Sequence, residues 1–251
     1  MGENVLPDLH YVAMDFGGHG LSSHYSPGVP YCHQNFVNEI RRVVAGGIVA
    51  GMFSCTFPEM VDKLVLLDSS PFVLDFHEVE NLLTYKRRAI EYTLQVEASE
   101  KPSHVVSPEQ MLQGLLKNNS HVSEKCGELL LQRGTTKVAT GLLLNRDRRI
   151  TLPELSLDFI SKELFVHFIR KLQAHVLLIK AVHGYYDVRR ENDADKEPFL
   201  FIIDMLKSTL KEQFQFVEVP GTHYVHMNEP QHVASIIGSF LQSKPRLPYQ
   251  L

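Results

Sequence analysis

Short apolar runs recur along this chain, with helical segments between them. Four of these runs are residues 9–15 (LHYVAMD), 63–68 (KLVLLD), 175–181 (HVLLIKA) and 214–219 (FQFVEV). Near-continuous apolar strands of this length are typical of parallel sheets that are covered by helices on both faces. Because parallel strands need a crossover between them, usually a helix, the pattern predicts an α/β fold with a parallel sheet.

The segments between these runs predict helices, most densely in the middle of the chain. Between residues 69 and 172 the strand signals disappear, and apolar residues from Val79 to Leu94 mark an amphipathic helix. Ser107, Pro108 and Gln110 form a capping-box pattern at the start of another helix. We therefore predict an all-helical insertion over 69–172 within a core formed by 1–68 and 173–251.

Composition narrows the classes of function and location. The net charge of the 251 residues is -4, and no basic stripe suggests a nucleic-acid partner. The three cysteines are widely spaced, which favours a reducing, cytoplasmic compartment over a disulfide framework or a zinc cluster. No apolar run approaches the roughly 20 residues of a transmembrane helix. The final Tyr-Gln-Leu shares only its last residue with the peroxisomal address, so a peroxisomal or vesicle-associated location has little support.

The most informative stretch, residues 214–230, combines a strand, a glycine turn, a histidine and a helix start. His223 follows Gly221 and Thr222 at the end of the strand. An imidazole in such a position can take and return a proton near neutral pH, although a purely structural histidine is the alternative. His226 lies three residues further on and could join His223 at a metal ion. No further ligand follows at a metal-binding spacing, so we predict no metal site.

Three stretches resemble the serine hydrolase-like proteins of the α/β-hydrolase superfamily. Residues 14–22 (MDFGGHGLS) are similar to the fourth strand of that fold and the loop after it. Residues 57–68 (FPEMVDKLVLLD) are similar to the helix end and strand after the nucleophile, and residues 221–230 (GTHYVHMNEP) to the histidine loop. The resemblance covers nearly the whole chain.

The resemblance implies a Ser-acid-His triad that hydrolyses ester or related acyl bonds of a small-molecule substrate without a cofactor. His223 matches the general base. Asp187, in the loop after the preceding strand, matches the acid, and Asp68 at the end of an earlier strand is the alternative that some relatives use. The segment 69–172 would then be a lid that shapes substrate choice.

The chain departs from the family at the nucleophile, because no Gly-x-Ser-x-Gly occurs in it. Only residues 45–47 separate the two helices that should flank a strand and its elbow, and the early strands with their oxyanion loop are also absent. Ser69 and Ser70 are better explained as a loop and cap than as substitute nucleophiles, and Cys55 as a core thiol. We predict a shortened, catalytically impaired form. The alternative is a non-catalytic binding or unstable protein that self-associates through unpaired sheet edges.

Overall fold

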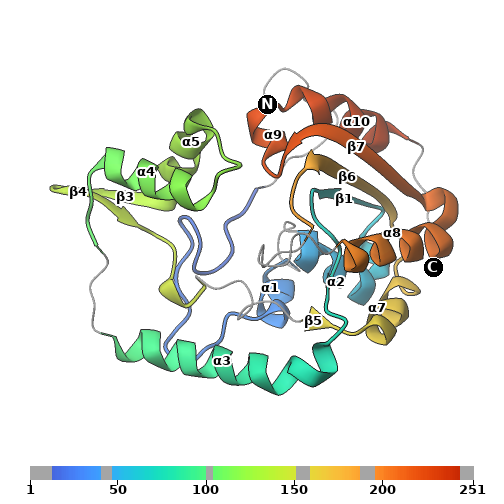
Figure 1. Cartoon of the computed structure of the whole chain (residues 1–251), viewed down its shortest axis with the longest axis horizontal. Coiled ribbons are helices and arrows are strands. Elements are labelled where there is room, and N and C mark those ends of the chain that lie inside the picture. The colour runs from blue at the N-terminus through green and yellow to red at the C-terminus, as the bar shows by residue number, and fades with distance from the viewer. Residues whose placement is uncertain (1–12, 41–46, 100–103, 151–158, 187–195, 244–251) are drawn as a thin grey trace. The chain divides into compact units, whose positions relative to one another are not determined.

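The chain forms two compact units. The structure, a computed structural model of the whole chain, describes residues 13–40, 47–99, 104–150, 159–186 and 196–243 (Figure 1). The first unit comprises 1–12, 40–78 and 159–251, and the second comprises 13–39 and 79–158. Residues 13–39 thus group with 79–158, so these units and the expected core and lid do not share their boundaries. The assignment of 69–172 as a lid stays a prediction.

A parallel sheet of three strands forms the centre of the first unit. The strand order is β1 (Lys63–Leu67), β6 (His175–His183), β7 (Phe214–Thr222), and both pairings are parallel. Three of the four predicted strands are therefore confirmed. The fourth predicted run, residues 9–15, lies mostly outside the described residues. A short second parallel pair joins β2 (Val73–Leu74) to β5 (Phe159–Ile160).

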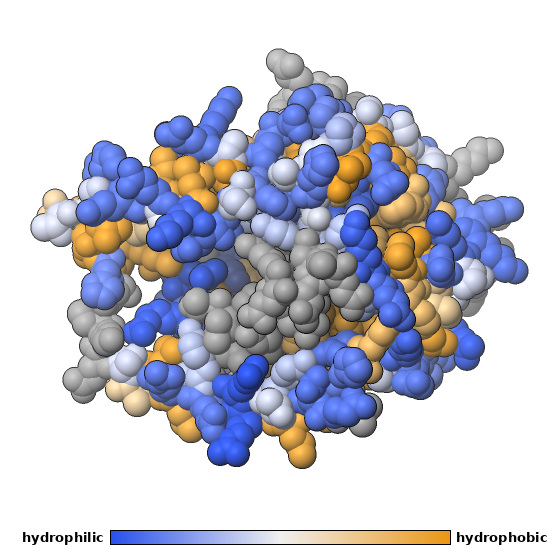
Figure 2. All heavy atoms as spheres, in the orientation of Figure 1, coloured by the Kyte–Doolittle hydropathy of each residue, from blue (hydrophilic) through white to orange (hydrophobic). Residues whose placement is uncertain are grey.

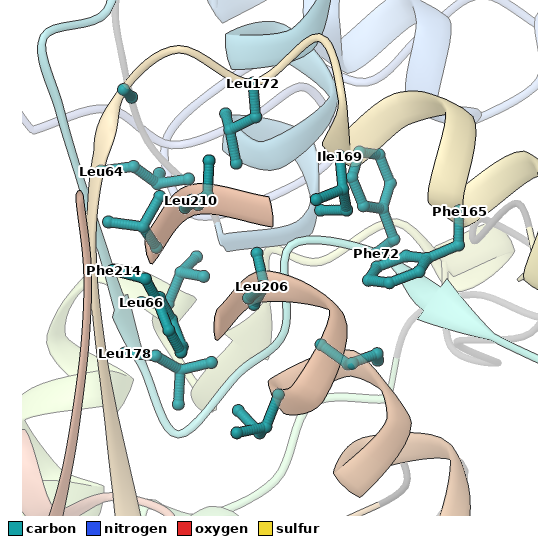
Figure 3. Close-up of a cluster of buried hydrophobic side chains, with 14 of the residues drawn as sticks. Leu64, Leu66, Phe72, Phe165, Ile169, Leu172, Leu178, Leu206, Leu210 and Phe214 are labelled. Atoms are coloured by element: carbon teal, nitrogen blue, oxygen red, sulfur yellow. The ribbon is translucent and has the colours of Figure 1, made fainter. Parts of the chain in front are cut away.

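Both faces of β6 are buried, which explains why its sequence is apolar almost throughout. Val176 and Leu178 belong to one buried cluster, and Leu177 and Ile179 to another, because successive side chains of a strand point to opposite faces. In Figure 3, Leu178 and other strand side chains lie against those of α8 (Glu197–Leu210). The other helices of this unit are α2 (Gly47–Thr56), η1 (Pro58–Met60), α7 (Lys162–Ile169), η3 (Lys211–Gln213), α9 (Val225–Asn228) and α10 (Gln231–Gln242).

The second unit contains several helices and a hairpin. Its strands, β3 (Thr135–Val138) and β4 (Gly141–Leu144), pair antiparallel. The segment 69–172 also contains β2 and β5, so the expectation that it is all-helical was wrong. The missed signal is the run Thr-Thr-Lys-Val, whose β-branched residues favour a strand although the run is short and polar. The helices among the described residues of this unit are α1 (His33–Ile40), α3 (Glu78–Ala98), α4 (Pro108–Asn118), α5 (Glu124–Gly134) and η2 (Arg148–Ile150).

Two helices of the second unit test the sequence patterns directly. The predicted capping box of α4 is present, because the Ser107 side chain accepts from the Gln110 N–H and the Gln110 side chain accepts from the Ser107 N–H. The predicted helix α3 forms, but Leu83, Ile90 and Leu94 on it are exposed. Figure 2 shows apolar side chains at the surface along this helix, among polar ones. The apolar pattern of α3 thus identified a helix without identifying a buried face.

Candidate active site

The carboxyl ends of the three central strands bring an aspartate and a histidine together. Asp68 directly follows β1, and His223 directly follows β7. The carboxyl ends of parallel strands meet at one edge of a sheet, which is where α/β folds place their ligands. Nδ1 of His223 lies 2.8 Å from Oδ2 of Asp68. The first unit alone therefore supplies an acid–histidine pair.

The backbone of Asp68 takes an uncommon conformation that directs its side chain into the sheet. Its φ is +44°, in the left-handed region where aspartate is tolerated better than most side chains. Its N–H donates to the carbonyl of Ile179 at 2.7 Å and so extends the pairing of β1 with β6 by one residue. Outliers of this kind persist where the surrounding structure enforces them, and they concentrate at functional sites.

Three donors surround the buried carboxylate of Asp68. Its Oδ1 accepts from Nζ of Lys180 at 2.6 Å and from the N–H of Ala181 at 2.9 Å, while Oδ2 faces His223. Burial raises the pKa of Asp68, but the hydrogen bonds from His223 and Lys180 outweigh burial and hold the pKa below its usual value. The group is therefore a carboxylate across the neutral range. A Cβ on Gly184 would lie 2.1 Å from Oδ2, so only glycine fits beside it.

The ring of His223 is oriented at one nitrogen and partly accessible to solvent. Its side chain is 30% exposed, whereas that of Asp68 is fully buried. The rings of Tyr185 and Tyr224 lie with their centroids 5.4 Å and 5.1 Å from that of His223. An ionised carboxylate can only accept, so Nδ1 carries the proton and Nε2 of the neutral ring has the lone pair. This is the tautomer that a general base of the triad type requires.

The turn that presents His223 depends on Gly221. This glycine has a φ of +121°, a conformation that side-chain-bearing residues rarely adopt. An added Cβ would also lie 2.9 Å from Cγ2 of Val225, the first residue of α9. The glycine turn predicted from the sequence is thus the element that places the imidazole.

His226 lies close enough to His223 to feel its charge, and its Nδ1 is buried without a hydrogen-bond partner among the described residues. Burial lowers the pKa of His226, the nearby His223 lowers it further, and Asp68 opposes the shift. Among the residues that the structure describes, no group of three or more His, Cys, Asp or Glu side chains could hold a metal ion.

The remaining candidate residues fall outside this pair. Asp187, the first choice for the acid, lies outside the described residues, as does the junction 41–46. The hydroxyls of Ser69 and Ser70 donate to the carbonyls of Ser70 and Phe72. Burial raises the pKa of the Cys55 thiol to about 12, so it is not a thiolate at neutral pH.

Two residues of the site, Lys180 and Gly184, were not predicted from the sequence. Lys180 is the single charged residue within the apolar run 175–181, and it could have been flagged as a buried charge in need of a partner. Gly184 follows β6 in a His-Gly-Tyr-Tyr turn, and nothing in its pattern indicates the close contact with Asp68.

None of the described helices combines the length and hydropathy that crossing a bilayer requires.

Several curated relatives align in sequence with nearly the whole chain. Human serine hydrolase-like protein 2 is 70% identical over 262 residues, an alignment that covers 98% of this chain and 83% of the relative. The zebrafish serine hydrolase-like protein is 35% identical and covers 98% of this chain and 77% of the relative. The chain belongs to the serine hydrolase-like family. It matches no protein-family model.

Solved structures place this serine hydrolase-like chain in the α/β-hydrolase fold. A hypothetical protein from Pseudomonas aeruginosa matches with a TM-score of 0.73 and 22% identity, over 90% of this chain and 80% of that one. The thioesterase domain from the curacin biosynthetic pathway matches with a TM-score of 0.69 and 17% identity, over 92% and 80%. At these identities the likeness establishes the fold and no activity. The predicted family and fold class are confirmed.

Proposed function

We propose that this chain carries the acid–base part of a serine hydrolase site that acts on ester or related acyl bonds of small molecules. His223 is the general base, and a buried carboxylate orients it. The observation that supports this most directly is the 2.8 Å contact between Nδ1 of His223 and Oδ2 of Asp68, an acid whose pKa is lowered despite burial. The site requires no cofactor.

In this proposal the two residues have separate tasks. Nε2 of His223 takes the proton of an attacking hydroxyl and later returns it to the leaving group. Asp68 does not itself become protonated, but it fixes the tautomer of the ring and stabilises the imidazolium that forms. The partial exposure of His223 leaves its ring within reach of a substrate, while the full burial of Asp68 keeps water from its carboxylate.

We propose Asp68 rather than Asp187 as the orienting acid. Two hydrogen bonds hold Oδ1 of Asp68 in place, and Oδ2 faces Nδ1 of His223. The carboxylate is thus fixed in the position that an orienting acid needs. In a longer form that carries the Gly-x-Ser-x-Gly elbow, Asp68→Asn should lower kcat by about 10⁴-fold, the effect that the same substitution has in a serine protease triad. Asp187→Asn is the matched control and should change kcat less than about threefold. The reverse ranking would assign the acid to Asp187.

We further propose that this chain itself is catalytically impaired. It contains no Gly-x-Ser-x-Gly sequence. Loss of the nucleophilic serine from a serine protease reduces turnover by about 10⁶-fold. The alignment with the human relative extends over 262 residues, more than the 251 of this chain, which supports the idea that residues present in the relative have no counterpart here.

A fluorophosphonate probe tests both parts of this proposal. The purified chain should remain unlabelled, while a longer form with the elbow should be labelled at its serine and lose the label on His223→Ala. Labelling of this chain at one serine, abolished by His223→Ala, would show that a replacement nucleophile exists. If the longer form keeps its activity after His223→Ala, the assignment of the general base is wrong.

A second candidate function is self-association through the sheet edge. Among the described residues β1 pairs with β6 alone, so the other side of β1 has no strand partner. An unpaired strand edge is a ready surface for pairing with another chain. Sedimentation velocity should show dimers or larger species whose proportion increases with concentration. A monodisperse monomer that melts cooperatively would contradict this proposal.

A further inference from the structure

Lys180 is a buried charge at a position where the strand pattern calls for an apolar residue. It lies in β6, and its side chain is only 1% exposed. Alternation along the strand puts it on the same face as Val176 and Leu178, which pack in the cluster that contains Phe199 of α8. Burying an ammonium is unfavourable unless it is paired and hydrogen-bonded. Packing alone therefore does not explain why a lysine occupies this position.

The ammonium contacts the residue after β1, a carbonyl of β6 itself, an aromatic ring in the turn after β6 and another in α8. Nζ donates to Oδ1 of Asp68 at 2.6 Å and to the carbonyl of Ala181 at 3.0 Å. It also lies 4.4 Å from the ring centroid of Tyr186 and 5.8 Å from that of Phe199. Aromatic faces attract a cation, and this attraction is stronger where water is excluded. The ammonium is thus fixed against a single oxygen of the acid.

We propose that Lys180 is a positioning residue for the Asp68–His223 pair and sets the pH range in which His223 is a neutral base. By occupying Oδ1, Lys180 leaves Oδ2 as the oxygen that faces Nδ1 of His223. Its positive charge also opposes protonation of the imidazole. The biological meaning of this inference rests on the proposed function, because it assumes that His223 acts as a base.

The sign of the charge effect follows from the net charge of the cluster. With Lys180 charged, Asp68 ionised and His223 neutral, the three groups carry no net charge, and protonation of His223 adds a buried positive charge. Without Lys180 the same protonation converts a net negative pair into a neutral one. Removing the lysine should therefore favour the imidazolium and raise the titration midpoint of His223 by on the order of one pH unit.

Other titratable groups also face the imidazole, and they are the same in every variant below. Tyr185 follows β6, and Tyr224 precedes α9, which carries His226. His183 lies opposite Thr222 in the pairing of β6 with β7. Because these groups are unchanged by a substitution at residue 180, a difference between variants reports the lysine itself.

The deciding experiment follows the imidazole carbons of the intact chain by NMR between about pH 5 and pH 9, a range centred near the reference value of histidine. The His223 signal is assigned with His223→Gln. Lys180→Met should raise the titration midpoint of His223 by about one pH unit. The matched control is Lys63→Met, which removes a lysine that donates to the carbonyls of Leu241 and Ser243, and it should leave the midpoint unchanged.

A purely structural role of Lys180 would lower the melting temperature without moving this midpoint. A folded Lys180→Met chain with an unchanged midpoint overturns the proposal. This outcome is independent of the proposed function, which the fluorophosphonate experiment tests on a longer form.

A second measurement on the unaltered chain decides the matter if Lys180→Met does not fold. The Nζ signal of Lys180 should exchange slowly with water, and it should shift with the same midpoint as His223, as should the carboxyl carbon of Asp68. A lysine ammonium that exchanges as fast as an exposed one, or that does not respond when His223 titrates, would overturn the proposal.

Discussion

Each of the two units buries an aspartate, and the two aspartates differ in what their partners can do. Asp68 in the first unit contacts Lys180 and His223. Asp147 in the second unit contacts Arg149, whose side chain is 9% exposed. In both cases burial raises the pKa of the carboxyl group, hydrogen bonds outweigh burial, and the pKa is lowered overall. The electrostatics of the two carboxylates are therefore alike.

The difference lies in the groups that use the carboxylate oxygens. Both oxygens of Asp147 accept from the guanidinium of Arg149, Oδ2 also accepts from the hydroxyl of Tyr31, and Oδ1 also accepts from the Arg149 N–H. An imidazole also lies near Asp147, but Nδ1 of His24 is 3.5 Å from Oδ2 and its Nε2 lies 2.7 Å from the carbonyl of Asn145. Arginine does not titrate in proteins. Among the described residues Asp68 has no guanidinium partner, and its Oδ2 lies 2.8 Å from Nδ1 of the partly exposed His223. A lowered pKa therefore identifies a fixed carboxylate, and the imidazole held at hydrogen-bond distance is what distinguishes the candidate site.

The largest expected effect is that of Asp68→Asn on stability. The substitution leaves Lys180, which is 1% exposed, without its counter-ion. Removing one partner of a buried ion pair lowers the free energy of unfolding by about 3–5 kcal/mol. Urea denaturation followed by circular dichroism measures this change.

A matched double variant distinguishes a lost hydrogen bond from an unpaired charge. Asp68→Asn combined with Lys180→Met should be more stable than Asp68→Asn alone, because no buried charge then lacks a partner. A double variant that is less stable than either single variant would refute the ion-pair explanation.

Arg149→Met should destabilise the second unit by about 2–3 kcal/mol, because it removes several charge-assisted hydrogen bonds from Asp147. The backbone N–H of residue 149 and the Tyr31 hydroxyl still donate to the carboxylate, so the effect is smaller than for Asp68→Asn. The same denaturation measurement applies. The His223 titration should not move, and a shift would mean that the two carboxylates are not independent.

The smallest expected effect concerns His226, whose pKa is lowered mainly by burial. Below the unperturbed value of about 6.5 the unfolded chain binds a proton that the folded chain does not, so stability falls as the pH decreases toward the lowered pKa. His226→Gln should reduce the loss of unfolding free energy between about pH 7 and pH 5 by up to about 1 kcal/mol. An unchanged slope in this interval would show that His226 is not the titrating group.

The sequence predicted β6 well because both of its faces are buried, which leaves a nearly continuous apolar run. The strands β1 and β7 are less buried, but each still has enough apolar residues in a short run to be recognised. The sequence also predicted the position of His223 because a glycine turn and a strand end are local features. The pairing of Asp68 with His223 joins residues 155 positions apart, and sequence patterns leave the choice of acid open. Strand alternation tells which face Lys180 occupies, but not that its side chain extends to the end of the neighbouring strand. The hairpin at Thr135–Leu144 was missed because Thr-Thr-Lys-Val is short and polar and Gly-Leu-Leu-Leu is short and continuously apolar, so neither run shows the alternation of a half-buried strand.

The contact between Gly184 and Asp68 affects how inherited variants of such a chain should be interpreted. Gly184→Ala adds a single methyl group, and a substitution matrix would score it as conservative. The methyl carbon would lie 2.1 Å from Oδ2 of Asp68, the oxygen that faces His223. This steric clash would displace the carboxylate. A carrier of this allele would produce a protein with every ionisable group of the site intact and the acid–base pair separated.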